Sequence, residues 1–271
     1  IGMVPKGATQ TFWLAVHEGA LKAADENGVE LVWNAPAQES DRSRQIAIVD
    51  SMINLGVDAL ALAPVDRSAL VNVVNRAIDR GIPVAIFDST LDSNRIVSFV
   101  ATDNREGGRT AARRLGTSLN GKGSVAIVDD MPGSASTTER VNGFQEEMRS
   151  KFPAIEVLPV QYVMADRAKA RAVTENLLTA HADLAGLFAD HENAAIGSAL
   201  ALSARGQRNV RLVGFDNSEQ LRQYLNEGWI DSLVVQNPEK MGHEAVRVLA
   251  VKLNGGTPER VIDTGSTLLT K

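Results

Sequence analysis

The chain has 271 residues, of which 44% are hydrophobic, 23% charged and 4% aromatic, so it is long enough for one large or two mid-sized domains with an aliphatic core. This composition excludes collagen, a coiled coil and a disordered chain as the main description, and no apolar run approaches the roughly 18 residues of a membrane span. A formal charge of −5 without a compensating basic cluster excludes nucleic acid as a direct partner, and the absence of cysteine excludes disulfides and thiolate chemistry.

In the first part of the chain, short apolar runs alternate with longer amphipathic stretches, which predicts strands alternating with helices. Gly28, Gly56 and Gly81 each follow a helical stretch and precede a strand, where a left-handed backbone is easiest for glycine. This punctuation predicts βαβ units and a parallel sheet. The expected strands are residues 1–5, 29–33, 59–63 and 83–87, and the expected helices are residues 11–27, 41–55 and 68–80.

The alternation continues through the rest of the chain and predicts further parallel-sheet units. The expected strands are residues 97–101, 124–128, 157–163, 184–189, 210–215 and 232–235. The expected helices are residues 104–119, 136–151, 166–181, 192–204, 218–226 and 238–254, followed by an extended tail over residues 261–271.

Two strands, one in each half of the chain, end in the same Phe-Asp-polar sequence. Asp88 follows the first strand and Asp216 the second. In open α/β sheets ligands lie beyond the carboxyl ends of the strands, so both aspartates are placed where a ligand binds. The alternative is that each is a helix N-cap, with Asp216 preceding the helix over 218–226. The repetition in two halves favours a shared ligand.

The sequence carries no motif typical of an enzyme site. It has no phosphate-binding loop or dinucleotide fingerprint after the first strand, no metal-binding spacing among its four histidines, and no nucleophile elbow at 133–137. Asp129 and Asp130 end a strand and have two interpretations, a Mg²⁺ or acid/base site and a solvated strand end, of which the second is favoured. We therefore expect no catalytic residue, no cofactor and no metal.

Seven segments carry a family resemblance that covers essentially the whole chain. They are FW at 12–13 with GA at 19–20, GVDALALAP at 56–64, GIPVAIFD at 81–88, ATDN at 101–104 with GG at 107–108, SASTTER at 134–140 with GF at 143–144, VGFD at 213–216, and QNP at 236–238. In this order the segments resemble the ribose-binding-protein family of periplasmic solute-binding proteins, the capture components of bacterial ABC sugar importers. LacI-type repressors share this fold in their effector domains.

The resemblance implies an α/β fold with two Rossmann-like lobes, each a doubly wound parallel sheet, joined by a three-segment hinge as in type I periplasmic binding proteins. The N-terminal lobe would comprise residues 1–103 and 237–262 and the C-terminal lobe residues 104–236 and 263–271, with the ligand between them. Asp103, Asn104 and Asn237 would belong to the hinge, where a few element-terminal residues absorb the rotation.

The resemblance also implies an aromatic contact to the ligand. Phe12 and Trp13 match the aromatic pair that opens the first helix and would lay a ring against the apolar face of a sugar. The alternative is a core role. Phe12 fits a buried stripe with Val16, Ala20 and Ala23, which leaves Trp13 as the better stacking candidate.

Four polar positions of the family are matched directly. Asp88 and Asp216 would accept hydrogen bonds from ligand hydroxyls, and Arg140 and Gln236 match the remaining polar positions of the second lobe and hinge. For Arg140 the alternative is an ordinary arginine on a helix surface.

Other positions depart from the family pattern. An arginine of the pentose-binding members is Ser89 here, the aromatic wall of the second lobe is replaced by Ala165 and the methionine before it, an asparagine is His191, and the asparagine of the first loop is Gln10. These changes argue against ribose itself as the ligand. They leave a pentose, a hexose, a deoxy sugar or a polyol.

Lys6 resembles a lysine of the rhamnose- and autoinducer-binding branch, where that side chain reaches ligand oxygens; its alternative is a solvated loop lysine. Because Lys6 and Arg140 are balanced by Asp88 and Asp216, a neutral carbohydrate is favoured over a sugar acid.

The leading hypothesis is a non-enzymatic, monomeric periplasmic receptor that captures a monosaccharide-like ligand, closes, and delivers it to the membrane permease of an ABC importer. A removed signal peptide or a lipoprotein anchor would place it outside the cytoplasmic membrane. The alternative is the ligand-sensing effector domain of a LacI-type transcriptional regulator, which the lack of basic residues for phosphate contacts disfavours. A third class, an α/β enzyme acting on a sugar, would turn its ligand over.

Overall fold

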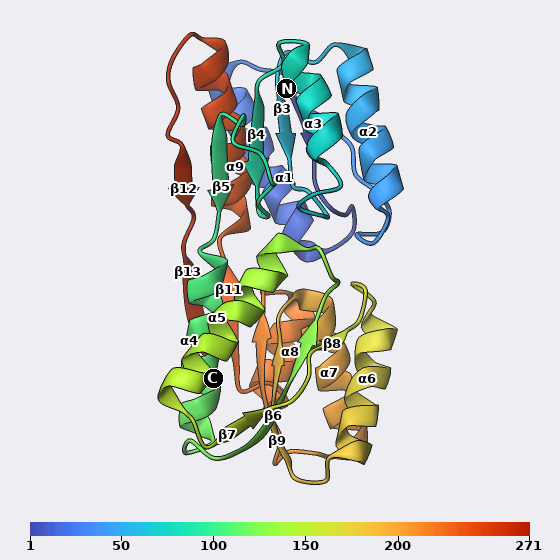
Figure 1. Ribbon diagram of the computed structural model, residues 1–271, viewed down its shortest axis with the longest axis vertical. Coiled ribbons are helices and arrows are strands. Elements are labelled where there is room, and N and C mark those ends of the chain that lie inside the picture. Colours follow the sequence, from blue (N-terminus) through green and yellow to red (C-terminus); the bar gives the residue numbers. More distant parts are fainter. The chain divides into compact units, whose positions relative to one another are not determined.

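The computed structural model describes all 271 residues, and its contacts divide the chain into two compact units (Figure 1). The first unit consists of Ile1–Thr102, Gly133–Ser136 and Asn237–Gly265, and the second of Asp103–Pro132, Thr137–Gln236 and Ser266–Lys271. Each unit is therefore discontinuous in sequence. Compared with the expected lobes, residue 103 lies in the second unit, and residues 133–136 and 263–265 lie in the first.

The first unit contains a six-stranded sheet in which every pairing is parallel. Strands β1 (Gly2–Val4), β3 (Leu60–Leu62) and β4 (Val84–Phe87) are completely buried, which fits apolar runs that carry helices on both faces. The sheet has the 2-1-3-4-5 order of a doubly wound fold, with β12 (Val261–Asp263) added at its edge. In spatial order the strands are β12 (Val261–Asp263), β5 (Ser98–Ala101), β4 (Val84–Phe87), β3 (Leu60–Leu62), β1 (Gly2–Val4) and β2 (Val32–Trp33).

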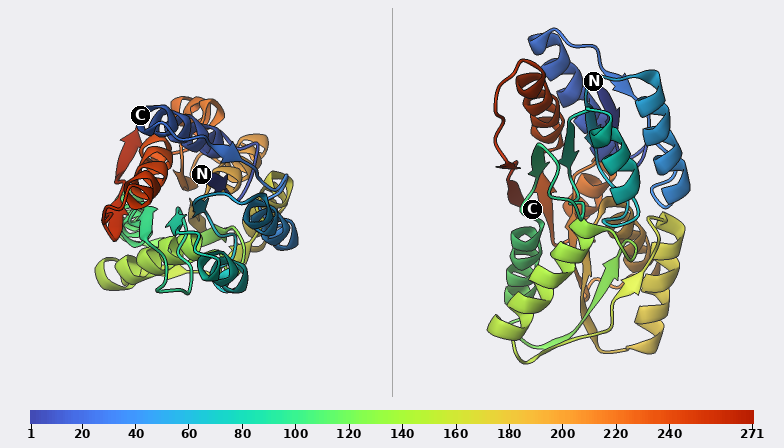
Figure 2. Two further views of the ribbon diagram at one scale, coloured as in Figure 1. Left: turned by 90° about the horizontal axis from the view of Figure 1, so that it is seen from above. Right: turned by 45° about the horizontal axis from the view of Figure 1, so that its top comes forward.

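Helices cover both faces of this sheet: α1 (Thr11–Asn27) and α9 (Pro238–Leu253) one face, α2 (Arg42–Leu55) and α3 (Val71–Asp79) the other (Figures 1 and 2).

Glycines let α1 and α9 approach each other closely. A Cβ atom at Gly19 would lie 1.9 Å from the carbonyl oxygen of Glu239, and one at Gly242 would lie 1.9 Å from that of Val16. Only glycine fits at these two positions. The small residues of the segment at 19–20 therefore have a packing role.

The second unit repeats the same sheet order with different strands. One pairing is antiparallel, between β11 (Ser232–Gln236) and β13 (Ser266–Thr270); all others are parallel. In spatial order the strands are β13 (Ser266–Thr270), β11 (Ser232–Gln236), β10 (Arg211–Phe215), β9 (Leu184–Ala189), β6 (Gly123–Asp129) and β7 (Ile155–Val157), with β8 (Gln161–Tyr162) beside the end of β6.

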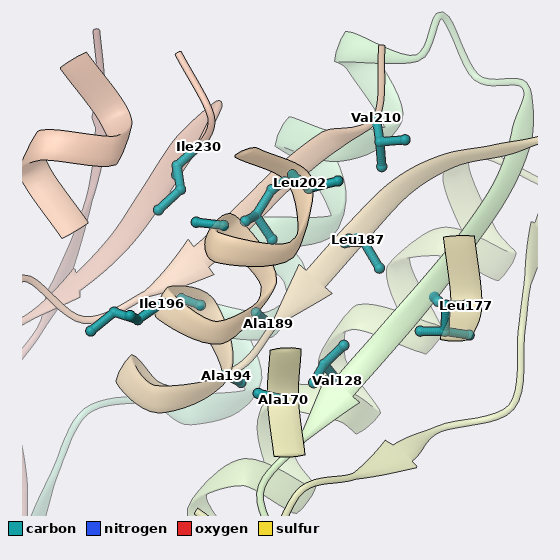
Figure 3. Close-up of a cluster of buried hydrophobic side chains, with 14 of the residues drawn as sticks. Val128, Ala170, Leu177, Leu187, Ala189, Ala194, Ile196, Leu202, Val210 and Ile230 are labelled. Carbon is teal, nitrogen blue, oxygen red and sulfur yellow. The ribbon is translucent and has the colours of Figure 1, made fainter. Parts of the chain in front are cut away.

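Two layers of helices enclose this second sheet. On one face lie α4 (Asn104–Ser118) and α5 (Ala135–Lys151), and on the other lie α6 (Arg167–Ala180), α7 (Glu192–Arg205) and α8 (Glu219–Glu227). Figure 3 shows the aliphatic cluster on the second face, in which side chains from α6 and α7 meet those of β6 and β9. The core is thus built mainly from small aliphatic layers, as the composition indicated.

A reciprocal pair of glycines also joins α4 and α5. A Cβ at Gly108 would lie 1.9 Å from the carbonyl oxygen of Arg140, and a Cβ at Gly143 1.9 Å from that of Arg105. The two units therefore use the same device to bring two helices together.

Three element predictions are corrected. The strand expected at 157–163 is two short strands, β7 and β8, separated by Pro159, which has no N–H to donate to a ladder. The single tail expected at 261–271 is two strands in different sheets, separated by Gly265 with a φ of 79°. The helix expected from residue 68 begins at Val71, because the Asp66 carboxylate accepts the backbone N–H groups of residues 68 and 69 in a turn. None of the helices combines the length and the hydropathy needed to cross a membrane.

Candidate binding site

Charged residues follow the strands at the carboxyl edge of each sheet. In the first unit Lys6 comes shortly after β1 and Asp88 follows β4; in the second unit Asp129 ends β6, Asp190 follows β9 and Asp216 follows β10. The direction of winding reverses between β1 and β3, and between β6 and β9. Ligands of doubly wound sheets bind at this edge near that reversal, so each unit has a candidate set of binding residues there.

Lys6 forms a buried ion pair with Asp88. Its Nζ lies 2.6 Å from Asp88 Oδ2, and the lysine is only 5% exposed. The same ammonium donates to Ser89 Oγ at 2.6 Å and to Ser136 Oγ at 3.0 Å, so its three protons have three partners. The alternative of a solvated loop lysine is therefore wrong. Ser136 is a partner that the sequence did not single out.

Asp88 and Asp216 end their strands in the same backbone conformation. Their φ angles are 60° and 74°, in the left-handed region that few residues other than glycine, asparagine and aspartate adopt. Each donates its backbone N–H to a carbonyl of the neighbouring strand, Val100 O at 3.0 Å and Val234 O at 2.9 Å. The repeated Phe-Asp sequence thus marks the same strand ending in both units.

The carboxylate of Asp216 is held by uncharged donors. Its Oδ1 accepts a hydrogen bond from Gln236 Nε2 at 2.6 Å, and its Oδ2 accepts the backbone N–H of Glu192 at 3.1 Å. Helix α8 is capped instead by Ser218, whose Oγ accepts from Leu221 N at 3.4 Å. The N-cap interpretation of Asp216 is therefore wrong.

The aromatic pair is placed differently from the expectation. Trp13 is 3% exposed and packs in the core with Val16, and its Nε1 donates to Glu39 Oε1. Phe12 is half-buried, with its ring edge-on to that of Trp13 at a centroid distance of 4.8 Å. The predicted stripe is confirmed at Val16, Ala20 and Ala23, which are buried. The prediction that Trp13 lies outside it is wrong, because Trp13 is buried with them and Phe12 is only partly buried. Gln10 precedes the helix, and its Oε1 is buried without a protein partner.

Arg140 lies inside the second unit, and the surface alternative is wrong. It is 3% exposed; its Nε donates to Asn104 Oδ1 at 2.8 Å and its Nη1 to the backbone oxygen of Asp190 at 2.7 Å. The guanidinium lies 3.8 Å from the centroid of the Phe215 ring. Stacking and a fork of donors hold the guanidinium in one orientation.

Asp129 and Asp190 form a buried acidic pair, which corrects the interpretation of a solvated strand end. Asp129 and Asp130 are each 3% exposed and Asp190 is completely buried. Burial, together with the charge of Asp190, raises the pKa of Asp129 to about 9, and burial raises the pKa of Asp190 to about 7. The two carboxyl groups interact with each other, and Asp190 Oδ1 lies 2.8 Å from His191 Nδ1. These side chains do not form a group of three or more ligands that could hold a metal ion.

The segment that replaces the aromatic wall of the family has a strained backbone. Met164 and Ala165 have φ angles of 58° and 54°. The backbone N–H of Met164 donates to Asp130 O at 2.7 Å, and Asn193 Nδ2 donates to Ala165 O at 2.7 Å. The turn is therefore held at the carboxyl edge by the ends of two elements, β6 and α7.

Two of the expected hinge residues are helix N-caps. Asp103 accepts the backbone N–H of Glu106 at 2.9 Å, and Asn237 accepts that of Lys240 at 3.1 Å. Asn104 is the first residue of α4 and bonds Arg140. These local contacts do not test a hinge role for the three residues, which stays a prediction.

The sequence did not predict the roles of Ser136 and Glu39 or the relation of Asp129 to Asp190. The aspartates could have been found, because each ends a strand and those two strands flank the point where an α/β sheet reverses direction. No sequence signal indicates that Ser136 and Glu39 meet Lys6 and Trp13.

The sequence matches the periplasmic binding protein domain family over residues 1–257. The chain belongs to this family. The D-ribose/D-allose-binding protein of Pseudomonas aeruginosa is 32% identical over 100% of this chain and 88% of its own length. A periplasmic component of an ABC-type sugar transport system from Hahella chejuensis superposes with a TM-score of 0.96 at 35% identity, over 100% of this chain and 99% of that one.

An ABC transporter solute-binding protein from Agrobacterium vitis, solved with bound D-fucose, is similarly close, with a TM-score of 0.96 and 32% identity over 100% of this chain and 94% of that chain. The predicted resemblance and the α/β class are confirmed. The relatives are binding proteins of transport systems, which supports a transport receptor over an enzyme and over the effector domain of a transcriptional regulator.

Proposed function

We propose that this chain is the solute-binding component of an ABC importer and that it captures a neutral monosaccharide or polyol without chemically changing it. Membership of the periplasmic binding protein family and the sugars named for its relatives support this function. The observation that carries it is the repeated strand ending at Asp88 and Asp216, which presents a buried carboxylate at the carboxyl edge of each sheet. Carboxylates are strong acceptors for sugar hydroxyls.

The charge of the candidate residues favours an uncharged ligand. Asp88 is paired with Lys6, and Asp216 is held by Gln236 and a backbone amide, so neither half of the proposed site offers an excess of cations for a sugar acid. Arg140 is stacked and hydrogen-bonded within its own unit. A polyol, whose hydroxyls both donate and accept, suits such a mixture of groups.

In this proposal residues of both units bind one ligand molecule. Phe12 supplies the ring for the apolar face of the sugar, and Trp13 supports it from behind. The other residues that we propose to contact the ligand are Lys6, Gln10, Asp88, Ser89, Arg140, Ala165, His191, Asp216 and Gln236. Asp103, Asn104 and Asn237 are the proposed hinge residues.

The proposal also covers location and partners. The receptor acts outside the cytoplasm, as expected for a relative of periplasmic sugar receptors, after removal of a signal peptide or on a lipid anchor. It works as a monomer and delivers its ligand to a membrane permease. Neither a cofactor nor nucleic acid takes part.

A thermal-shift panel followed by calorimetric titration tests this function. The probes are D-ribose, D-allose, D-fucose, further pentoses and hexoses, and open-chain polyols, each at millimolar concentration. A ligand that binds only the folded state raises the unfolding temperature, so we expect at least one probe to do so. Asp216→Ala should abolish that shift, whereas the exposed-carboxylate control Asp92→Asn should keep it. If no probe stabilises the parent protein, the proposed function is wrong.

A further inference from the structure

His191 presents one ring nitrogen to Asp190 and keeps the other without a protein partner. The residue precedes α7 in an extended conformation, and its side chain does not cap that helix. Its Nδ1 lies 2.8 Å from Asp190 Oδ1, whereas its Nε2 is buried and bonds no protein group. A buried, unpartnered ring nitrogen at the carboxyl edge of the sheet is a position from which a ligand can be bound.

The partner of Nδ1 determines the chemistry of Nε2. A neutral imidazole has one N–H and one lone pair, and a carboxylate can only accept. When Asp190 is ionised, the proton of His191 must therefore be on Nδ1, and Nε2 carries the lone pair. In this state His191 is a hydrogen-bond acceptor toward a ligand.

The surroundings of Asp190 keep it in the accepting role. Asp129 and Asp190 are interacting buried acid groups, which is only favourable when one of them holds a proton, and burial gives Asp129 the higher pKa. The charge of Arg140 on α5 stabilises the negative charge of Asp190, while Asp130 and Asp216, beyond the ends of β6 and β10, act against it. Asp129 thus holds the proton, and Asp190 is left as the acceptor of the His191 ring N–H.

Gln236, like His191, is oriented by a carboxylate so that it offers a hydrogen-bond acceptor. Its Nε2 donates to Asp216 Oδ1 at 2.6 Å, and because that carboxylate only accepts, the amide cannot be reversed. Its Oε1 is therefore left as an acceptor, and it is buried without a partner in the protein. His191 and Gln236 both offer acceptors from the second unit.

We propose that Asp190 is a positioning residue that holds His191 in the Nδ1–H tautomer, so that Nε2 accepts a hydrogen bond from a ligand hydroxyl. This inference rests on the proposed function in one respect only, namely that the ligand carries hydroxyl groups. The ligand hydroxyl that contacts Nε2 must donate the hydrogen bond. If an ether, carbonyl or fluorine replaces that hydroxyl, two acceptors face each other and the affinity for the ligand falls.

The tautomer is tested without any ligand, by nitrogen-15 NMR of the imidazole rings at about pH 8, where Asp190 is mostly ionised. His191→Asn assigns the signals. His243 is the internal control, because its Nε2 lies 2.7 Å from the carboxylate of Glu26, whereas its Nδ1 lies 3.7 Å from that of Glu244, beyond hydrogen-bond distance. We expect the proton on Nδ1 in His191 and on Nε2 in His243, and we expect Asp190→Asn to produce a mixture of tautomers at His191 alone. A proton found on Nε2 of His191 in the parent protein overturns the proposal.

The consequence for specificity is tested with whichever of D-ribose, D-allose or D-fucose binds, together with its monodeoxy and monodeoxyfluoro analogues. For one hydroxyl the fluoro analogue should bind as weakly as the deoxy analogue, each about tenfold or more below the parent sugar, since fluorine cannot donate. The His191→Ala variant should bind these deoxy and fluoro analogues no more weakly than it binds the parent sugar. If every fluoro analogue binds like the parent sugar, the acceptor role is wrong. If no probe of the whole panel binds but the tautomers are as expected, the proposed function fails, and the role of Asp190 in setting the tautomer of His191 stands.

Discussion

Asp88 and Asp216 occupy the same place in two sheets of the same order, yet they are neutralised in different ways. Both have left-handed backbones and both follow a buried phenylalanine. Asp88 has an ammonium 2.6 Å away, whereas Asp216 has an amide and a backbone N–H. A repeated backbone feature therefore sets the position of the carboxylate, and the residues that neighbour it in each unit determine how its charge is balanced.

This difference has energetic consequences. Removal of a buried cation leaves the carboxylate beside it with an uncompensated charge, whereas removal of one neutral donor leaves the other hydrogen bonds of the carboxylate in place. Replacing one partner should therefore damage the first unit more than the second.

The largest effect is expected from Lys6→Met, which removes the ammonium beside a buried carboxylate. The free energy of unfolding should fall by about 3 to 5 kcal/mol, measured by urea denaturation. Gln236→Leu, the matching change beside Asp216, should cost about 1 to 3 kcal/mol. The double variant Lys6→Met/Asp88→Asn should recover most of the first loss. Equal losses in the two single variants would show that the two carboxylates are balanced alike.

Where the two units share a device, the same substitution should have similar effects. Gly242→Ala in the first unit and Gly108→Ala in the second each place a methyl group 1.9 Å from a carbonyl oxygen, and each should destabilise by about 1 to 3 kcal/mol. Urea denaturation measures the free energy of unfolding of both variants. If only one variant is destabilised, the two helices of the other unit can move apart without a loss of stability.

The second unit should also show the stronger dependence of stability on pH. The pKa of Asp129 is about 9 in the folded chain against an ordinary value of 3.8, so between these pH values the folded state holds a proton that the unfolded state has lost. Stability should therefore fall as the pH rises, by up to about 1.4 kcal/mol per pH unit from Asp129 alone, and more steeply below about pH 7, where the folded state also keeps the proton of Asp190.

Urea denaturation at several pH values from 5 to 8 measures this slope. In Asp129→Asn, which cannot ionise, the slope should be smaller. An unchanged slope would mean that another group takes up the proton.

The smallest effect is expected from Ser218→Ala. The loss of the cap of α8 should cost about 1 kcal/mol, with sugar affinity unchanged. Titration calorimetry and urea denaturation of this variant separate the capping role of Ser218 from the binding role proposed for Asp216. A large loss of affinity in Ser218→Ala would contradict that separation.

The sequence by itself determined the α/β alternation, most strand and helix positions, and the repeated Phe-Asp ending, because each depends on periodicity or on a short local pattern. It also carried the family resemblance, whose segments are spread over both units.

Only the tertiary structure decided which polar groups are buried together. Lys6 meets a serine 130 residues away, and Ser89 meets the same serine at a separation of 47. Asp129 and Asp190 become partners because β6 and β9 are neighbours in the sheet. Strand order brings such residues together, and local pattern does not encode it. For the same reason the sequence could not tell that Trp13, and not Phe12, faces the core: the buried side of a helix is set by the elements that it packs against.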